Sequence, residues 1–190
     1  MGATLLLDFT VKSIIHDYQV NFIENSNTAL KTELEKGDAI IVDKKIKKLY
    51  PDLVDSFSEI EHILEIEANE NQKSYKALAP LISRLIEGGF KKNNKIIAIG
   101  GGITQDTSAF IASIMYRGVD WIFFPTTLLA QGDSCIGSKT SINFGEYKNQ
   151  LGGFYPPHKI YIDAHFLDTL DESDMQSGLG EMSHYFVVSG

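Results

Sequence analysis

Three consecutive glycines, Gly100 to Gly102, separate an apolar run from a helical pattern. The run 95–99 has the composition of a buried strand, and apolar side chains recur at helical spacing from Ile103 onward. Strand, glycine turn and helix together let backbone N–H groups approach a phosphate at the start of the helix. Asp106 falls in the first turn of that helix, where the dipole favours a carboxylate that can also accept hydrogen bonds from ligand hydroxyls. A triple glycine at such a turn can equally be structural.

Polar and charged residues crowd the span from 126 to 149, and packing does not readily explain them. Lys139 and Lys148 are nine residues apart and bracket a turn, so both could converge on one anion. The alternative is an exposed polar hairpin. The other polar members of the span are Thr126, Thr127, Gln131, Asp133, Ser134, Thr140, Asn143 and Asn149.

Charged residues before the glycine turn also allow two interpretations. Asp43 ends the apolar run 39–42, and ligands of open parallel sheets lie at the carboxyl ends of strands. It could also cap the next helix, and the two roles are compatible. Glu70 and Lys73 have the spacing of an ordinary ion pair at a helix start.

Glu181 and His184 are three residues apart in the last predicted helix and therefore project from one face. A glutamate and a histidine at this spacing can share a metal ion with further ligands. The alternative is an exposed acid beside a packed histidine.

The elements that must position these residues alternate between strand and helix. The pattern predicts an α/β fold with a mostly parallel sheet, flanked by helices and preceded by an N-terminal β-hairpin within residues 4–24. Further strands are expected at 39–43, 60–67, 95–99, 120–124 and 159–163, helices at 29–36, 44–50, 74–88, from 103 and at 171–189, and a hairpin at 137–144.

The composition limits the kinds of partner that the protein is expected to bind. The chain of 190 residues has a net charge of −8, which disfavours bulk attraction to nucleic acid or to an anionic membrane. No apolar run approaches the ~20 residues of a membrane span. The single cysteine, Cys135, excludes an internal disulfide and suits a reducing cytoplasm, where we expect the protein and where this thiol would serve as a small packed side chain.

Several blocks in fixed order resemble the 3-dehydroquinate synthase family, part of the wider group of sugar-phosphate cyclases. The matching residues are 100–106 (GGGITQD), Arg117-Gly118, 125–131 (PTTLLAQ), 133–140 (DSCIGSKT), Lys148-Asn149, Gly152, Phe154-Tyr155 and 178–181 (GLGE). A metal alcohol dehydrogenase similar to glycerol dehydrogenase fits less well, because the blocks from 133 and from 148 match the cyclases better.

The resemblance implies an NAD- and zinc- or cobalt-dependent lyase of the shikimate pathway of aromatic amino-acid biosynthesis. Its substrate would be a seven-carbon sugar-acid phosphate (DAHP). In such a reaction NAD would oxidise a ring alcohol that zinc polarises, and phosphate would be eliminated. The hydride would then return, the ring would open, and an internal aldol closure would give 3-dehydroquinate. Two alternatives are a sister cyclase of the 2-epi-5-epi-valiolone or 2-deoxy-scyllo-inosose synthase type, and a nucleotide-binding module without catalysis.

The resemblance also implies roles for individual residues. Lys139 and Asn149 would hold the substrate, Arg117 would reach across a homodimer interface, and Glu181 would bind the metal. His184 stands where the family usually has a substrate-contacting lysine, which hints at a different substrate. The cofactor side would comprise Asp43, Glu70, Lys73, Gly101, Gly102, Ile103, Asp106, Thr126, Thr127, Asp133, Ser134, Lys139, Lys148 and Thr169.

The resemblance covers the N-terminal half of the family's chain. It implies a Rossmann-like NAD-binding domain over residues 1–170 and, at 171–190, the first helix of a helical domain that is otherwise absent. That helical domain supplies the two histidine ligands of the family's metal site. We therefore expect this chain to bind NAD weakly and to be inactive by itself.

Overall fold

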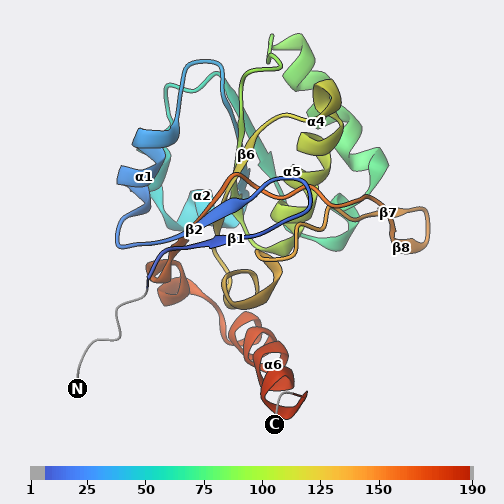
Figure 1. Cartoon of the computed structure of the whole chain (residues 1–190). Coiled ribbons are helices and arrows are strands. Elements are labelled where there is room, and N and C mark those ends of the chain that lie inside the picture. Colours follow the sequence, from blue (N-terminus) through green and yellow to red (C-terminus); the bar gives the residue numbers. More distant parts are fainter. Residues whose placement is uncertain (1–6, 189–190) are drawn as a thin grey trace.

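A computed structural model describes residues 7–188 and shows a seven-stranded sheet with helices on both faces (Figure 1). Along the sheet the strand order is β1-β2-β9-β6-β5-β3-β4, and every neighbouring pair is parallel except β1 with β2. The strands are β1 (Phe9–Val11), β2 (Tyr18–Ile23), β3 (Ala39–Asp43), β4 (His62–Ile66), β5 (Ile96–Gly100), β6 (Trp121–Pro125) and β9 (Lys159–Asp163). The expected α/β fold with an antiparallel N-terminal hairpin is confirmed.

The direction of winding reverses between β3 and β5. The chain passes from β3 outward to β4, and then returns to place β5 on the other side of β3. Loops after β3 and β5 therefore leave in opposite directions and open a crevice at the carboxyl ends of these two strands. Ligands of open α/β sheets bind at such a reversal.

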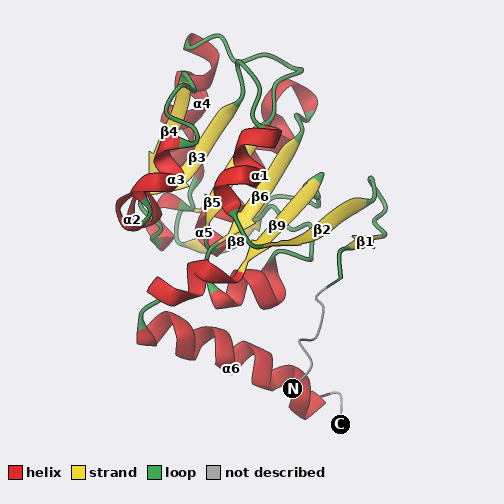
Figure 2. Cartoon of the chain, turned by 90° about the vertical axis from the view of Figure 1, so that its left-hand side faces the viewer, coloured by secondary structure: helices red, strands yellow, loops and turns green. Residues whose placement is uncertain are grey.

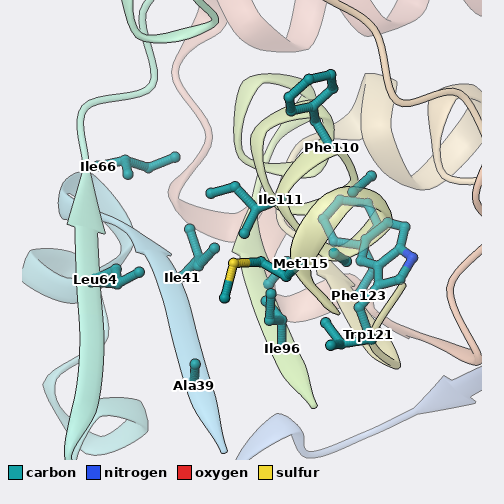
Figure 3. Packing of buried hydrophobic residues seen from close by; sticks show 14 of the residues in the cluster. Ala39, Ile41, Leu64, Ile66, Ile96, Phe110, Ile111, Met115, Trp121 and Phe123 are labelled. Atoms are coloured by element: carbon teal, nitrogen blue, oxygen red, sulfur yellow. The ribbon is translucent and has the colours of Figure 1, made fainter. Parts of the chain in front are cut away.

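Side-chain alternation along the strands divides the core into two layers. Ile41, Leu64 and Trp121 belong to the layer that also contains buried residues of α4 (Tyr75–Glu87) and α5 (Gly102–Ile114), and Figure 3 shows part of this layer. Ile40 and Phe124 belong to the opposite layer, which is covered by α1 (Ser26–Glu33), α2 (Lys44–Leu49) and α3 (Pro51–Asp55). Burial on both faces explains the nearly continuous apolar runs of the central strands.

A final helix, α6 (Glu172–Val188), passes across the carboxyl ends of the strands (Figure 2). It follows the 3₁₀ segment η4 (Ala164–Thr169) and contacts the π-helical turn η3 (Ala130–Ser134). A Cβ atom added to Gly178 would lie 2.8 Å from Leu128, so α6 approaches this region at a distance that only glycine permits. None of the helices in residues 7–188 is long and apolar enough to cross a membrane.

A small hairpin, β7 (Ile142–Phe144) and β8 (Tyr147–Leu151), projects beyond the main sheet. The hairpin expected at 137–144 therefore lies further along the chain. Its two-residue turn begins at Gly145, whose φ of +58° suits the first central position of a primed hairpin turn. Two short 3₁₀ segments, η1 (Glu70–Gln72) and η2 (Met115–Arg117), complete the described elements. The division into domains at residue 170 stays a prediction, and residues 1–6 and 189–190 lie outside the described residues.

Candidate functional site

The glycine turn follows β5 at the winding reversal, and its three glycines have different surroundings. A Cβ atom at Gly100 would lie 2.3 Å from the Thr104 hydroxyl oxygen, and one at Gly101 would lie 2.9 Å from the Thr127 methyl carbon. A Cβ atom at Gly102 would have no neighbour within 4 Å among the described residues. The first two glycines are therefore needed for packing, whereas the third leaves the start of α5 open.

The start of α5 is also electrostatically suited to an anion. No side chain of the described residues caps this helix at Gly101, so the first N–H groups are left for solvent or a ligand. Thr126 donates its backbone N–H to the Gly100 carbonyl at 3.0 Å, and Thr127 packs beside Gly101. In this structure the two predicted threonines hold the turn, and a phosphate would fit against it.

A cleft of about 230 Å³ opens beside the first turns of α5. It gathers side chains from four separate stretches of the chain, all of them rich in polar groups. Its lining consists of Lys73, Gln105, Asp106, Asp133, Ser134, Ile136, Gly137, Lys139, Ser141 and Asn149.

Lys73 and Asp106 form the electrostatic centre of this cleft. The Lys73 ammonium lies 2.5 Å from a carboxylate oxygen of Asp106, and their side chains are only 9% and 19% exposed. Burial raises the pKa of Asp106, and the neighbouring Lys73 acts in the opposite direction. The expected alternative of a Glu70–Lys73 ion pair is wrong, because Glu70 instead accepts a hydrogen bond from Asn143 at 2.8 Å.

Asn149 reaches the cleft from the β7–β8 hairpin. Its amide oxygen accepts a hydrogen bond from Lys73 at 2.7 Å, and its φ of +55° is left-handed, a conformation that asparagine tolerates better than most residues. Lys139 also lines the cleft, whereas Lys148 is exposed on β8 and is not part of the lining. Of the two lysines expected to converge on one anion, only Lys139 therefore lines the cleft.

Two residues of the site had no role predicted from the sequence. Gln105 donates to the Ser134 carbonyl at 2.6 Å and accepts from the Ser134 hydroxyl at 2.9 Å, which fixes one wall of the cleft. Asn143 bridges Glu70 and Asn149. The sequence feature that could have identified Asn143 is a single amide side chain between two apolar residues of one strand.

Cys135 follows Ser134 in the chain and is buried. Burial raises the pKa of its thiol to about 12, which fits the small packed side chain that was expected.

Asp43 lies at the carboxyl end of β3, on the strand adjacent to the glycine turn. Its side chain accepts the backbone N–H of Lys45 at 2.9 Å and caps α2, as one interpretation predicted. Burial raises the pKa of this half-buried carboxyl. Its position beside the crevice remains compatible with a ligand contact.

Arg117 and Thr169 lie away from the cleft. Arg117 precedes β6 and is therefore at the amino end of the sheet, opposite the glycine turn. Thr169 pairs its hydroxyl with that of Tyr50 at 2.7 Å. Tyr50 borders a second, larger cleft of about 370 Å³, whose charged lining residues are three acids and His165. This second cleft is poorly suited to a phosphate because its lining contains no lysine or arginine.

Glu181 and His184 are both exposed on α6. Among residues 7–188, no three histidine, cysteine, aspartate or glutamate side chains gather as a metal site requires. The described residues therefore do not fit a complete metal site, and Glu181 offers at most one ligand to it.

Sequence comparison places these features in a known context. The sequence model described as 3-dehydroquinate synthase N-terminal matches residues 63–177, which include the glycine turn, the cleft and the start of α6. The chain belongs to the 3-dehydroquinate synthase family. The 3-dehydroquinate synthase of Streptococcus equi subsp. equi is 38% identical over 178 residues, which cover 90% of this chain and 49% of that relative. The chain thus spans about half the length of the curated relatives it matches.

Solved structures of this family group show the same fold. A 2-epi-5-epi-valiolone synthase from Streptomyces hygroscopicus subsp. jinggangensis, with NAD+ and Zn2+ bound, has a TM-score of 0.80 and 29% identity, covering 90% of this chain and 49% of its own. A 2-deoxy-scyllo-inosose synthase complexed with carbaglucose-6-phosphate, NAD+ and Co2+ also has a TM-score of 0.80. Its identity is 24%, its alignment covers 91% of this chain and 50% of its own, and it supports the fold alone. Family membership and the Rossmann-like fold are confirmed, whereas the role of each site residue stays a prediction.

Proposed function

We propose that this chain is the NAD-binding part of a 3-dehydroquinate synthase, a lyase that cyclises a seven-carbon sugar-acid phosphate with loss of phosphate. The observation that carries the proposal is the open glycine turn at the winding reversal, beside a cleft that contains Lys73, Asp106, Lys139 and Asn149. The relatives named above support the same assignment. A cytoplasmic location, a place in the shikimate pathway and a homodimer are parts of this proposal.

On the cofactor side, the start of α5 would hold the pyrophosphate of NAD through the N–H groups of Gly102 and Ile103. Asp106, held beside Lys73 by their ion pair, would accept a hydrogen bond from a ribose hydroxyl, and Asp43 would do the same at the end of β3. Bound NAD would supply the acceptor and donor of a hydride at the substrate ring. Asp133 and Lys148 would lie at the boundary between cofactor and substrate, and Ser134 would contact the cofactor.

On the substrate side, Lys139 would contribute a point charge to the phosphate, and Asn149 would orient a ring hydroxyl through its amide. Both residues line the cleft and are exposed, so an incoming substrate could reach them from solvent. Arg117, at the far edge of the sheet, could act only on the site of another subunit. Glu181 would be one ligand of a zinc or cobalt ion whose other ligands lie outside the described residues.

A sister cyclase is the second candidate. His184 stands where the family usually has a lysine, and this exposed imidazole is shorter than a lysine side chain. The structural similarity to 2-epi-5-epi-valiolone synthase adds support. A panel of sugar phosphates offered to the complete enzyme, with product identified by mass spectrometry, separates the two candidates.

Calorimetry with NAD tests the cofactor part of the proposal. We expect the wild-type chain to bind NAD, and Gly102→Val to lose at least about tenfold in affinity because the new side chain occupies the space needed by a phosphate. Gly153→Val is the matched control, since an added Cβ there also meets no described atom within 4 Å. Equal affinities of the two variants, or no binding by the wild-type chain, would contradict the proposal.

A further inference from the structure

Asn143 is a buried residue whose side-chain amide both donates and accepts a hydrogen bond. It lies on β7 and is 7% exposed. Its Nδ2 donates to a carboxylate oxygen of Glu70 at 2.8 Å, and its Oδ1 accepts the backbone N–H of Asn149 at 2.9 Å. The orientation of the amide is fixed by these partners, because an N–H can only donate and a carboxylate can only accept.

Two further hydrogen bonds close a circuit through the same residues. The backbone N–H of Asn143 donates to the Lys73 carbonyl at 2.7 Å, and the Lys73 ammonium donates to the Asn149 amide oxygen at 2.7 Å. The β7–β8 hairpin is thereby joined at three atoms to the segment around residue 73. A circuit in which every member is satisfied holds its groups more firmly than isolated bonds do.

Asn149 depends on this circuit for its direction. Its left-handed backbone is unusual for a non-glycine residue, and the residue is otherwise exposed on β8. The Asn143 side chain holds the Asn149 backbone, while Lys73 holds the Asn149 side chain. If the Asn143 side chain were removed, Lys73 alone would hold Asn149, and the Asn149 amide would be aimed at the cleft less firmly.

We propose that Asn143 is a positioning residue that fixes Asn149 at the cleft and connects it to Glu70 on the cofactor side. The roles of Glu70 and Asn149 toward ligands rest on the function proposed above, whereas the hydrogen-bond circuit itself does not. Asn143 touches neither ligand in this proposal. Its contribution is to make the substrate-side and cofactor-side contacts depend on one another.

Amide hydrogen exchange, followed by NMR on the 190-residue chain, tests the first half of the proposal. In Asn143→Ala we expect the Asn149 N–H to exchange about tenfold faster, because it loses its acceptor, while amides of β5 remain unchanged. Asn143→Asp retains an acceptor and should keep the Asn149 exchange rate close to wild type. Ile142→Val, which loosens the same hairpin without touching the circuit, controls for general destabilisation. An Asn149 rate that is unaltered in Asn143→Ala, or raised equally in Ile142→Val, overturns the proposal.

NAD titration by calorimetry tests the connection to Glu70. We expect Asn143→Ala to weaken NAD binding by about three- to tenfold, and Gln150→Ala, on the exposed side of the hairpin, to have no effect. Asn143→Asp should bind NAD nearly as well as wild type at low pH and progressively worse as the pH rises, because two adjacent carboxylates then both ionise. A pH-independent defect overturns the connection. Failure of the wild-type chain to bind NAD contradicts the proposed function instead, and leaves the exchange experiment as a separate test of Asn143.

Discussion

Two regions at the carboxyl edge of the sheet carry family motifs, but only one of them is complete within the described residues. In the cleft beside α5, Lys73 contacts both Asp106 and Asn149 directly. On α6, by contrast, Glu181 and His184 are exposed, and no metal-binding group of three residues forms anywhere in residues 7–188. The first region is assembled by the segment after η1, by α5 and by the β7–β8 hairpin, and all three lie within the described residues. The second region has a helix to present its residues, but no further metal-ligating side chains of the described part of the chain gather around them.

The largest effect that this comparison predicts comes from the buried cation of the cleft. Lys73→Met leaves the Asp106 carboxylate buried without its partner, and we expect a loss of about 3 kcal/mol in the free energy of unfolding at neutral pH. Because burial already raises the pKa of Asp106, the defect should shrink as the pH falls through the folded-state pKa and the carboxyl becomes neutral. Urea unfolding across pH measures this, with Lys148→Met as the exposed control. A defect no larger than the control's would show that the cleft is not held by this pair.

The glycine turn should show the next largest effect. Gly100→Ala places a methyl group 2.3 Å from the Thr104 hydroxyl, and we expect about 1–3 kcal/mol of destabilisation from overpacking. Gly102→Ala, two residues away and with open space around its Cβ, should change stability by less than about 0.5 kcal/mol. Thermal and urea unfolding of the two variants measure the difference. Equal losses would mean that the turn is not packed as described.

A smaller effect is expected where α6 begins. Lys45 lies 2.7 Å from Asp171, and this ammonium lowers the pKa of the carboxyl to about 2. In Lys45→Met we expect an NMR titration to show the Asp171 pKa rising toward its usual value, whereas Lys48→Met leaves it unchanged. Since the folded-state pKa is depressed, the stabilisation is present above the ordinary value of 3.8 and is lost as the pH falls toward 2. An unshifted Asp171 would mean that α6 is not anchored through Lys45.

The smallest effects should come from α6 itself. Glu181→Gln and His184→Lys change exposed side chains, so we expect the melting temperature and the affinity for NAD to stay at wild-type values. Added Zn2+ should not raise the melting temperature of this chain, because ligand binding stabilises only where a site exists. A zinc-dependent rise that Glu181→Gln abolishes would show that the described residues do form a metal site, and the contrast between the two regions would disappear.

The features that could be predicted from the sequence were the central strands, which follow from local hydrophobic patterns, and the residues placed at the carboxyl ends of strands. Apolar runs identified the central strands, and the rule that ligands gather at carboxyl ends placed Asp43 one strand from the glycine turn. The roles of Thr126 and Thr127 were less visible, because their contacts with the turn are made across the end of a neighbouring strand.

Side-chain partners were harder to predict than positions. Lys73 was expected either to pair with Glu70 or to bind a ligand, yet it contacts Asp106 and Asn149, residues far away in the sequence. The hairpin was expected too early because the turn residue, Gly145, is one of several glycines in that span. Arg117 matches a family block by sequence, but its place at the opposite end of the sheet follows from the length of α5.

The glycine contact between α6 and Leu128 has a mechanical consequence. Because Gly178 has no side chain, the backbone of α6 packs directly against Leu128. A small tilt or slide of α6 must therefore displace Leu128. The next residue toward the N-terminus is Thr127, whose methyl group limits where Gly101 can sit. A force applied to the last helix is therefore passed, over two tight contacts, to the loop on which a phosphate would rest.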